Sequence, residues 1–172
     1  MDDFLEKALD RLGYEWNTFH KTSEYLHINR DKRDMLSNAV LESFLIHARL
    51  IHEFLIKEGW KDNLTADELV DEVDLWKQTK PSLFPNFGRT QEIGGLEYKN
   101  GWYDLIHKYL AHLSKARISF KPKWPVTDIY SECKDALGKF IICLGDDKGR
   151  YFVRRYPTIN FPIRNLKSSS QS

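Results

Sequence analysis

The sequence has few of the residues that mark secreted, disulfide-stabilised or fibrous proteins. Its 172 residues include two cysteines, six prolines and nine glycines. Cys133 and Cys143 fall in one expected helix, and the helical rise of 1.5 Å per residue places them about 15 Å apart, beyond disulfide reach. We therefore expect both thiols to be reduced core residues, as is usual in cytoplasmic proteins.

Long hydrophobic runs are also missing. No apolar segment approaches the roughly 18 residues that a membrane-spanning helix needs. The N-terminal stretch MDDFLEKALD is acidic and amphipathic, and it lacks the basic start and apolar centre of a signal peptide. These absences predict no membrane span and a cytoplasmic location.

Charge of one sign does not dominate the whole chain. The 26 basic and 25 acidic residues give a formal net charge of +1, which excludes a polycation. The balance differs along the chain, because basic residues outnumber acidic ones from Asp146 onward: Lys148, Arg150, Arg154, Arg155, Arg164 and Lys167. A basic arm at 146–172 on a mildly acidic domain at 1–145 indicates an anionic partner. Its aromatic residues would stack on single-stranded RNA.

Helical periodicity is what the sequence has in quantity. The apolar spacing predicts helices at about 3–12, 15–27, 31–57, 102–117 and 125–144. Gly13 and Gly59 are the expected stops of the first and third helices. The connection 60–101 is expected to be loop, with one or two helical turns where Thr65 and Glu68 would form a capping box.

The segment after 146 alternates enough to predict a short strand or an extended arm packed on the body. The sum of these elements is an all-α, up-and-down bundle of four or five helices with an extended C-terminal arm.

The third predicted helix is apolar nearly all round. At 100° per residue, one face gathers Leu36, Val40, Ser43, His47, Leu50, Ile51 and Phe54. So apolar a helix is expected to lie at the centre of the bundle or at a dimer interface. His47 lies inside the apolar arc, and we expect a core histidine whose hydrogen bonds are satisfied.

A narrow stripe remains on the same helix. It consists of Asn38, Glu42, Leu45, Arg49, His52 and Ile56, spaced by three and four residues. It fits a solvated strip, a buried polar network that fixes helix register, or a catalytic or ligand-binding face. Glu42 and Arg49 are two turns apart, too far for an ideal pair along one helix, so they are expected to reach across to a neighbouring helix.

The fourth predicted helix carries two histidines. Its inward face gathers Trp102, Ile106, Tyr109, Leu113 and Ala116. His112 falls at the edge of that face near Lys108, where a histidine is either a general acid or base or a cap on the core edge. His107 and His112 are five residues apart and diverge, whereas a zinc pair needs a spacing of four. We therefore predict no metal site, and no cofactor.

Two runs and one tryptophan carry a family resemblance. NAVLESFLIHARLIHEFL at 38–55, LIHKYLAHLSKAR at 105–117 and Trp124 before the last helix look like small bacterial HEPN-like proteins. Some of these are linked to abortive infection, and the helix order agrees across 31–144. The resemblance implies an up-and-down helical bundle, usually dimeric. It also implies either a metal-independent endoribonuclease of a toxin or antiviral defence system, or an inactive binding module.

The ribonuclease motif of that family is an arginine, four to six residues, and a histidine on one helix. His112 matches the histidine, but Leu105, Ile106 and His107 occupy the arginine positions. A cleaving site needs a cation to stabilise charge on the phosphate, with the RNA 2′-OH as nucleophile. The substitutes in this sequence are Lys108, Arg117 and Arg49.

Two functional hypotheses follow. The first is an HEPN-like RNA-binding or RNA-cleaving dimer, with His112, Lys108 and Arg49 as catalytic residues. Its binding residues would be Arg117, Glu42, His52 and Asn38. The second is a non-catalytic module for dimerisation or protein interaction, which the missing arginine and the all-round apolar helix favour. A small-molecule or nucleotide-binding bundle is less favoured, because the sequence has no glycine-rich phosphate loop.

Overall fold

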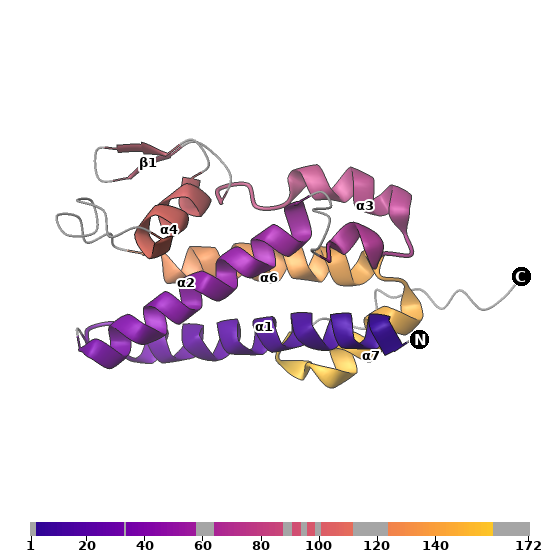
Figure 1. Ribbon diagram of the computed structural model, residues 1–172, viewed down its shortest axis with the longest axis horizontal. Helices are drawn as coiled ribbons and strands as arrows, with labels where there is room; N and C mark the ends of the chain where they lie inside the picture. The colour runs from indigo at the N-terminus through magenta and orange to yellow at the C-terminus, as the bar shows by residue number, and fades with distance from the viewer. Residues whose placement is uncertain are drawn as a thin grey trace, which may run out of the picture.

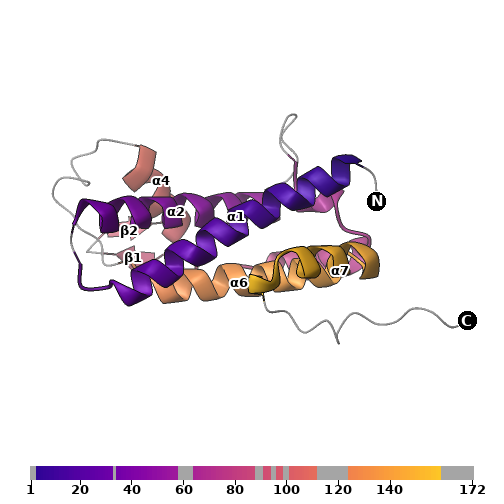
Figure 2. The same cartoon turned by 90° about the horizontal axis from the view of Figure 1, so that it is seen from below.

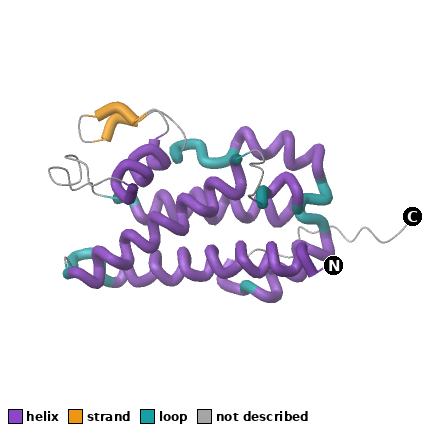
Figure 3. Tube along the Cα trace, in the orientation of Figure 1, coloured by secondary structure: helices purple, strands orange, loops and turns teal. Residues whose placement is uncertain are grey.

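The computed structural model describes residues 3–32, 34–57, 64–87, 91–93, 96–98, 101–111 and 124–159. Its helices are α1 (Asp3–Ile28), α2 (Met35–Ile56), α3 (Val73–Thr79), α4 (Gly101–Ala111), α6 (Val126–Cys143) and α7 (Asp146–Arg155). Single 3-10 turns are η1 (Ala66–Glu68), η2 (Lys80–Ser82) and η3 (Pro157–Ile159). One antiparallel hairpin pairs β1 (Gln91–Ile93) with β2 (Leu96–Tyr98). The predicted all-α class is confirmed, with the hairpin as a small addition (Figure 3).

The long helices α1, α2 and α6 form the body of the molecule (Figures 1 and 2). Helix α2 contacts α1, α4, α6 and η1, so it is central, as its apolar surface predicts. The core between these helices is aromatic: the rings of Phe19 and Phe44 stack at 4.7 Å, and Phe54 meets Phe140 edge-on at 5.4 Å. None of the helices in the described ranges combines the length and apolarity needed to cross a membrane.

Helix α2 ends within one residue of the prediction but begins at Met35, four residues after the predicted start, and its buried side differs from the predicted face. Asp34 caps the helix by accepting a hydrogen bond from the Ser37 amide at 2.7 Å. The buried residues are Ser37, Phe44, Leu45, Ala48, Ile51 and Leu55, whereas Leu36 is 58% exposed. A helix that is apolar nearly all round does not reveal by periodicity which arc its neighbours cover.

Helix α1 is continuous, so the predicted stop at Gly13 is wrong. The ring of Tyr156 lies against Gly13, where an added Cβ would overlap it. The Tyr156 hydroxyl donates to the Asp10 side chain at 2.8 Å. Gly13 is therefore explained by close packing in the middle of a helix, at a propensity cost of about 1 kcal/mol.

The connection 60–101 holds more structure than predicted. Thr65 precedes η1 but makes no side-chain capping bond, so the predicted capping box is not formed. Helix α3 follows, anchored by the buried Trp76, whose indole N–H donates to Asp67. Asp67 also binds Lys80 at 2.8 Å. A helix of seven residues held by one tryptophan carries too little periodicity to be recognised.

The expected strand or extended arm is also wrong in its described part. Residues 146–155 form α7, which follows Gly145 at a φ of +81°. Phe152 and Val153 are buried, and the Tyr151 hydroxyl donates to Glu6 at 3.1 Å and Asp10 at 3.2 Å. These aromatic residues thus pack on α1. Residues 160–172 lie outside the described ranges.

The fifth predicted helix is confirmed as α6, with Pro125 at its N-cap position. Cys133 and Cys143, at 1% exposure or less, are free thiols on this helix. The prediction that they form no disulfide is confirmed.

Candidate functional site

A polar cluster centred on Glu53 lies where the second half of α2 meets the start of α4. One oxygen of Glu53 receives a hydrogen bond from the Tyr103 hydroxyl at 2.7 Å. The same oxygen lies 3.4 Å from Arg49 Nε and 3.2 Å from Lys57 Nζ. Arg49, Glu53 and Lys57 follow each other at the four-residue spacing that brings side chains together on a helix. Tyr103 comes from the first turn of α4, so the cluster joins the two helices.

The cluster holds Glu53 ionised and Tyr103 protonated. Burial opposes charge on Glu53, but the hydrogen bonds from Tyr103 and Lys57 and the charge of Arg49 outweigh it and lower the pKa of this carboxyl. Burial, followed by the bond to Glu53, raises the pKa of Tyr103 to about 12. One carboxylate therefore faces two cations and a phenol donor. Arg49 Nε is buried without a hydrogen bond, because its contact with Glu53 at 3.4 Å is an ion pair that does not meet hydrogen-bond geometry.

His52 lies in an aromatic enclosure beside this cluster. Its ring centroid is 4.7 Å from the rings of Phe84 and Phe87 and 5.2 Å from Tyr103. Burial lowers the pKa of His52 to about 4, so the imidazole is neutral at physiological pH. Its Nδ1 is buried without a hydrogen-bond partner. A histidine in this state is a poor general acid or base near neutrality.

The predicted site residues on α2 are only partly brought together. Arg49 and His52 share the cluster region, as a buried polar network would require. Asn38 is exposed and lines a separate groove at the start of the helix. Glu42 is half-buried, one turn or more from either group. The carboxylate that Arg49 contacts is Glu53, four residues later on α2 itself.

Of the candidate site residues on the fourth predicted helix, some lie in the described part of the chain and others do not. Lys108 is exposed in the last turn of α4. Leu105 and Ile106 are buried, as expected for a core-facing side of this helix. His112 and Arg117 lie outside the described residues.

A second polar cluster joins α1 to α2. Glu15 is 7% exposed, and its two oxygens bind Arg11 at 2.9 Å and His47 Nδ1 at 2.6 Å. Tyr14 meets the His47 ring edge-on, with centroids 6.3 Å apart, and Arg11 lies 5.3 Å above the Tyr14 ring. His47 is thus a histidine with a satisfied hydrogen bond, as predicted.

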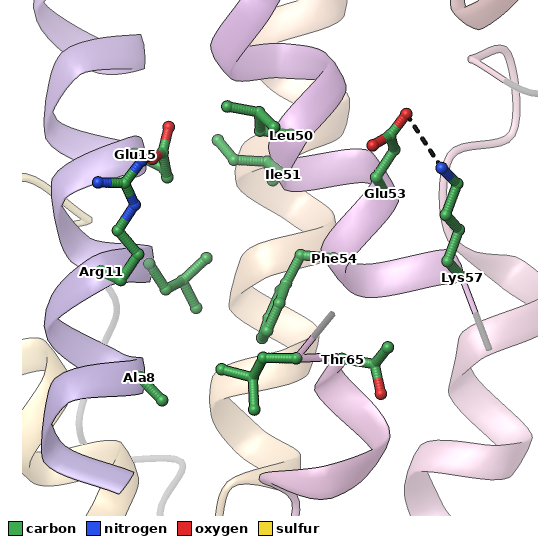
Figure 4. A pocket seen from close by; sticks show the side chains of 11 residues that line it. Ala8, Arg11, Glu15, Leu50, Ile51, Glu53, Phe54, Lys57 and Thr65 are labelled. Atoms are coloured by element: carbon green, nitrogen blue, oxygen red, sulfur yellow. Dashed lines mark ion pairs between the residues drawn. The ribbon is translucent and has the colours of Figure 1, made fainter. Parts of the chain in front are cut away.

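A pocket of about 320 Å³ opens between α1, α2 and the residues before η1. Its walls are mostly apolar: Ala8, Leu12, Leu50, Ile51, Phe54 and Leu64. Figure 4 shows Arg11 and Glu15 on one side and Glu53 with Lys57 on the other. Both ion pairs are internally neutralised, so the pocket suits an apolar group better than a charged one.

Sequence reasoning missed Glu53, Tyr103 and Glu15. The four-residue spacings of Glu53 from Arg49 and Lys57 do predict ion pairs along one face of the helix. The roles of Tyr103 and Glu15 depend on contacts between helices, which a single sequence does not display. In the described ranges, no group of three or more histidine, cysteine or acidic side chains is arranged to hold a metal ion.

Known proteins give no further guide to this site. Comparison with protein-family models, with curated proteins and with solved structures found no match to this chain. The function is therefore argued from the geometry of the clusters and surfaces described above.

Proposed function

We propose that this chain is a non-catalytic, HEPN-like helical module that acts as a homodimer. The observation that carries the proposal is the outer face of α2. Met35, Leu36 and Ile46 are 88%, 58% and 44% exposed, on the same helix that supplies the centre of the core. Met35 and Ile46 fall on nearly the same side of α2, with Leu36 further round the helix, and exposed apolar side chains on one helix are typical of an interaction surface.

A second copy of the chain is the partner that this face suits best. If two α2 helices cross antiparallel about a two-fold axis near Ile46, residues on either side of Ile46 meet their counterparts. Each Ile46 would then pack on the partner's Ile46, and the same patch would serve both subunits, as an isologous interface requires.

The charge states of Arg49 and His52 favour a protein-interaction role over RNA cleavage. The cation of Arg49 faces the Glu53 carboxylate, which offsets its charge. His52 is neutral and enclosed by aromatic rings. Neither group is arranged to stabilise a phosphate or to carry a proton. The leucine at position 105, where the family motif allows an arginine, supports the same conclusion.

The dimer is tested by light scattering on the purified chain. We expect a mass of about twice 20.3 kDa for the wild type. Ile46→Glu should be a folded monomer, because a charge at the centre of the face opposes its burial. Leu75→Glu is the matched control, since Leu75 is similarly exposed on α3. A wild type that stays monomeric at high concentration contradicts the proposal.

The absence of catalysis is tested separately with single-stranded RNA. We expect wild type and His112→Ala to show the same background cleavage. Cleavage by the wild type that is lost in His112→Ala would restore the ribonuclease hypothesis, whatever the oligomeric state.

A further inference from the structure

The pocket between α1 and α2 has the size and the lining of a small-molecule site. Its volume of about 320 Å³ lies within the range of about 300–1,000 Å³ that is typical of ligand pockets, which combine mostly apolar walls with a few polar groups. It opens to solvent, so a ligand can enter without unfolding of the helices. It is also distinct from the dimer face, because Met35, Leu36 and Ile46 do not line it.

Both long helices contribute large apolar side chains to the walls of this pocket. Leu12 of α1 and Leu50 and Phe54 of α2 line it. Figure 4 shows the small Ala8 on α1 across from Phe54. Leu50 and Phe54 are only half-buried, although α2 is the central helix of the bundle, and the lining residue Leu64 is half-buried as well. A ligand that packs here removes apolar surface from water on several sides at once, which favours binding.

The ring of Phe54 indicates that the ligand is aromatic. This ring meets Phe140 edge-on, with centroids 5.4 Å apart, and Phe140 is the only ring among the described residues that packs on it. Aromatic rings pack favourably, offset or edge to face, at centroid distances of about 4.5–7 Å. A ring in the pocket would give Phe54 a second contact of this kind.

The charged groups that line the pocket indicate that the ligand is uncharged. Arg11 lies 2.9 Å from Glu15, and Lys57 lies 3.2 Å from Glu53. Glu15 is also held by its contact with His47 at 2.6 Å. A charged guest would compete with an existing ion pair for each of these groups, whereas an uncharged one leaves all of them in place.

We propose that this pocket binds an uncharged aromatic molecule with two fused rings. An apolar cavity of about 150 Å³ is filled by benzene, so a pocket of about 320 Å³ holds a body of roughly two rings. One ring packs on Phe54, and the other lies between Leu12 and Leu50. A polar substituent on the ligand points outward to solvent, past the two ion pairs.

The test is an NMR titration of the full chain, read at the methyl signals of the leucine and isoleucine residues that line the pocket. Indole-3-ethanol is the uncharged probe. Indole-3-acetate and tryptamine are the matched controls, because they carry the same rings and a two-carbon arm that ends in a negative or a positive charge. We expect indole-3-ethanol to shift the Leu12 and Leu50 signals saturably, with a Kd of about 1 mM or lower. Each charged analogue should bind at least about tenfold more weakly.

Variants locate the binding in the pocket. Leu50→Trp places two rings of the chain's own there, so it should abolish the shifts of the remaining pocket methyl groups while the thermal unfolding temperature is preserved. Leu75→Trp is the matched control, because it adds the same rings on α3, outside the pocket, and should bind like the wild type. Phe54→Leu keeps the wall apolar but removes the ring, and it should weaken binding about fivefold.

Ile46→Glu should bind indole-3-ethanol like the wild type, so loss of the dimer and loss of the ligand are distinguishable. The proposal is overturned if indole-3-ethanol produces no saturable shift, or if the charged analogues bind equally well. It is also overturned if both Leu50→Trp and Phe54→Leu bind like the wild type.

Discussion

Glu15 of α1 and His47 of α2 are joined by a contact of 2.6 Å in the seam between the two longest helices. The side chains are only 9% and 12% exposed, and Arg11 binds the other carboxylate oxygen at 2.9 Å. A polar pair in such a position fixes how α1 and α2 align, because a shift along the seam would leave a carboxylate buried without its partner.

Loss of His47 should therefore destabilise the fold. His47→Ala leaves Glu15 with only its contact to Arg11, and breaking a buried pair costs about 3 kcal/mol. Arg11→Ala is the control, with an expected loss below about 1 kcal/mol, because the Arg11 side chain is 73% exposed. Urea unfolding followed by circular dichroism measures both. Equal small losses in the two variants would show that the Glu15–His47 pair has no special role.

The buried His52 predicts that the chain becomes less stable in mild acid. Its pKa falls from an ordinary 6.5 to about 4 in the folded state. Between these values the unfolded chain binds a proton that the folded chain does not, so stability decreases as the pH falls from 6.5 towards 4. The full shift corresponds to about 3 kcal/mol.

The variant His52→Phe isolates this contribution. A phenyl ring keeps the packing with Phe84 and Phe87 and removes the titrating nitrogen. The free energy of unfolding, measured across pH 4 to 7, should decline less steeply in His52→Phe than in the wild type. Parallel curves would place the acid sensitivity in other groups.

The contact between Gly13 and Tyr156 predicts that Gly13→Ala destabilises the fold when Tyr156 is present and stabilises it when the tyrosine ring is removed. Gly13→Ala in the wild type should cost about 1–3 kcal/mol, because the new methyl group overlaps the tyrosine ring. In a Tyr156→Ala background the ring is gone, and the same change should stabilise by up to about 1 kcal/mol through helix propensity. Thermal unfolding of the four variants completes the cycle. A cost that persists without the ring would point to a different cause.

The two thiols should be unreactive in the folded chain. Burial raises the pKa of Cys133 and of Cys143, which disfavours the thiolate that attacks reagents such as Ellman's reagent. We expect two equivalents of thiol to react in guanidinium chloride and almost none under native conditions. Rapid native labelling would mean that α6 opens far more often than its packing indicates.

The helices that could be predicted are those whose own segment contains a long, regular apolar pattern. Helices α2 and α6 were predicted because each has a long apolar period, and α2 contains neither glycine nor proline. The break at Gly13 was wrong because the reason for that glycine lies 143 residues away in Tyr156. Helix α7 was missed because alternating aromatic and basic residues resemble a strand.

The candidate site was also only partly predictable, because periodicity within one helix identifies residues but not their contacts with other helices. Arg49 and His52 were selected from their place on a helical stripe, but their chemical states depend on groups outside it. Tyr103 helps hold Glu53 ionised, and the rings of Phe84 and Phe87 enclose His52. Periodicity places a residue on a face, and only the fold shows what lies opposite.

The packing of the chain's last described segment on α1 has a consequence for synthesis on the ribosome. The indole N–H of Trp16 donates to the hydroxyl of Thr158, 142 residues later, and the Tyr156 ring covers Gly13. Helix α1 is translated before α7 and η3, yet Tyr156 and Thr158 from the end of the described chain help to cover this side of it. Until those residues leave the exit tunnel, the nascent chain carries an uncovered apolar surface, and it depends on chaperones or on rapid completion to avoid aggregation.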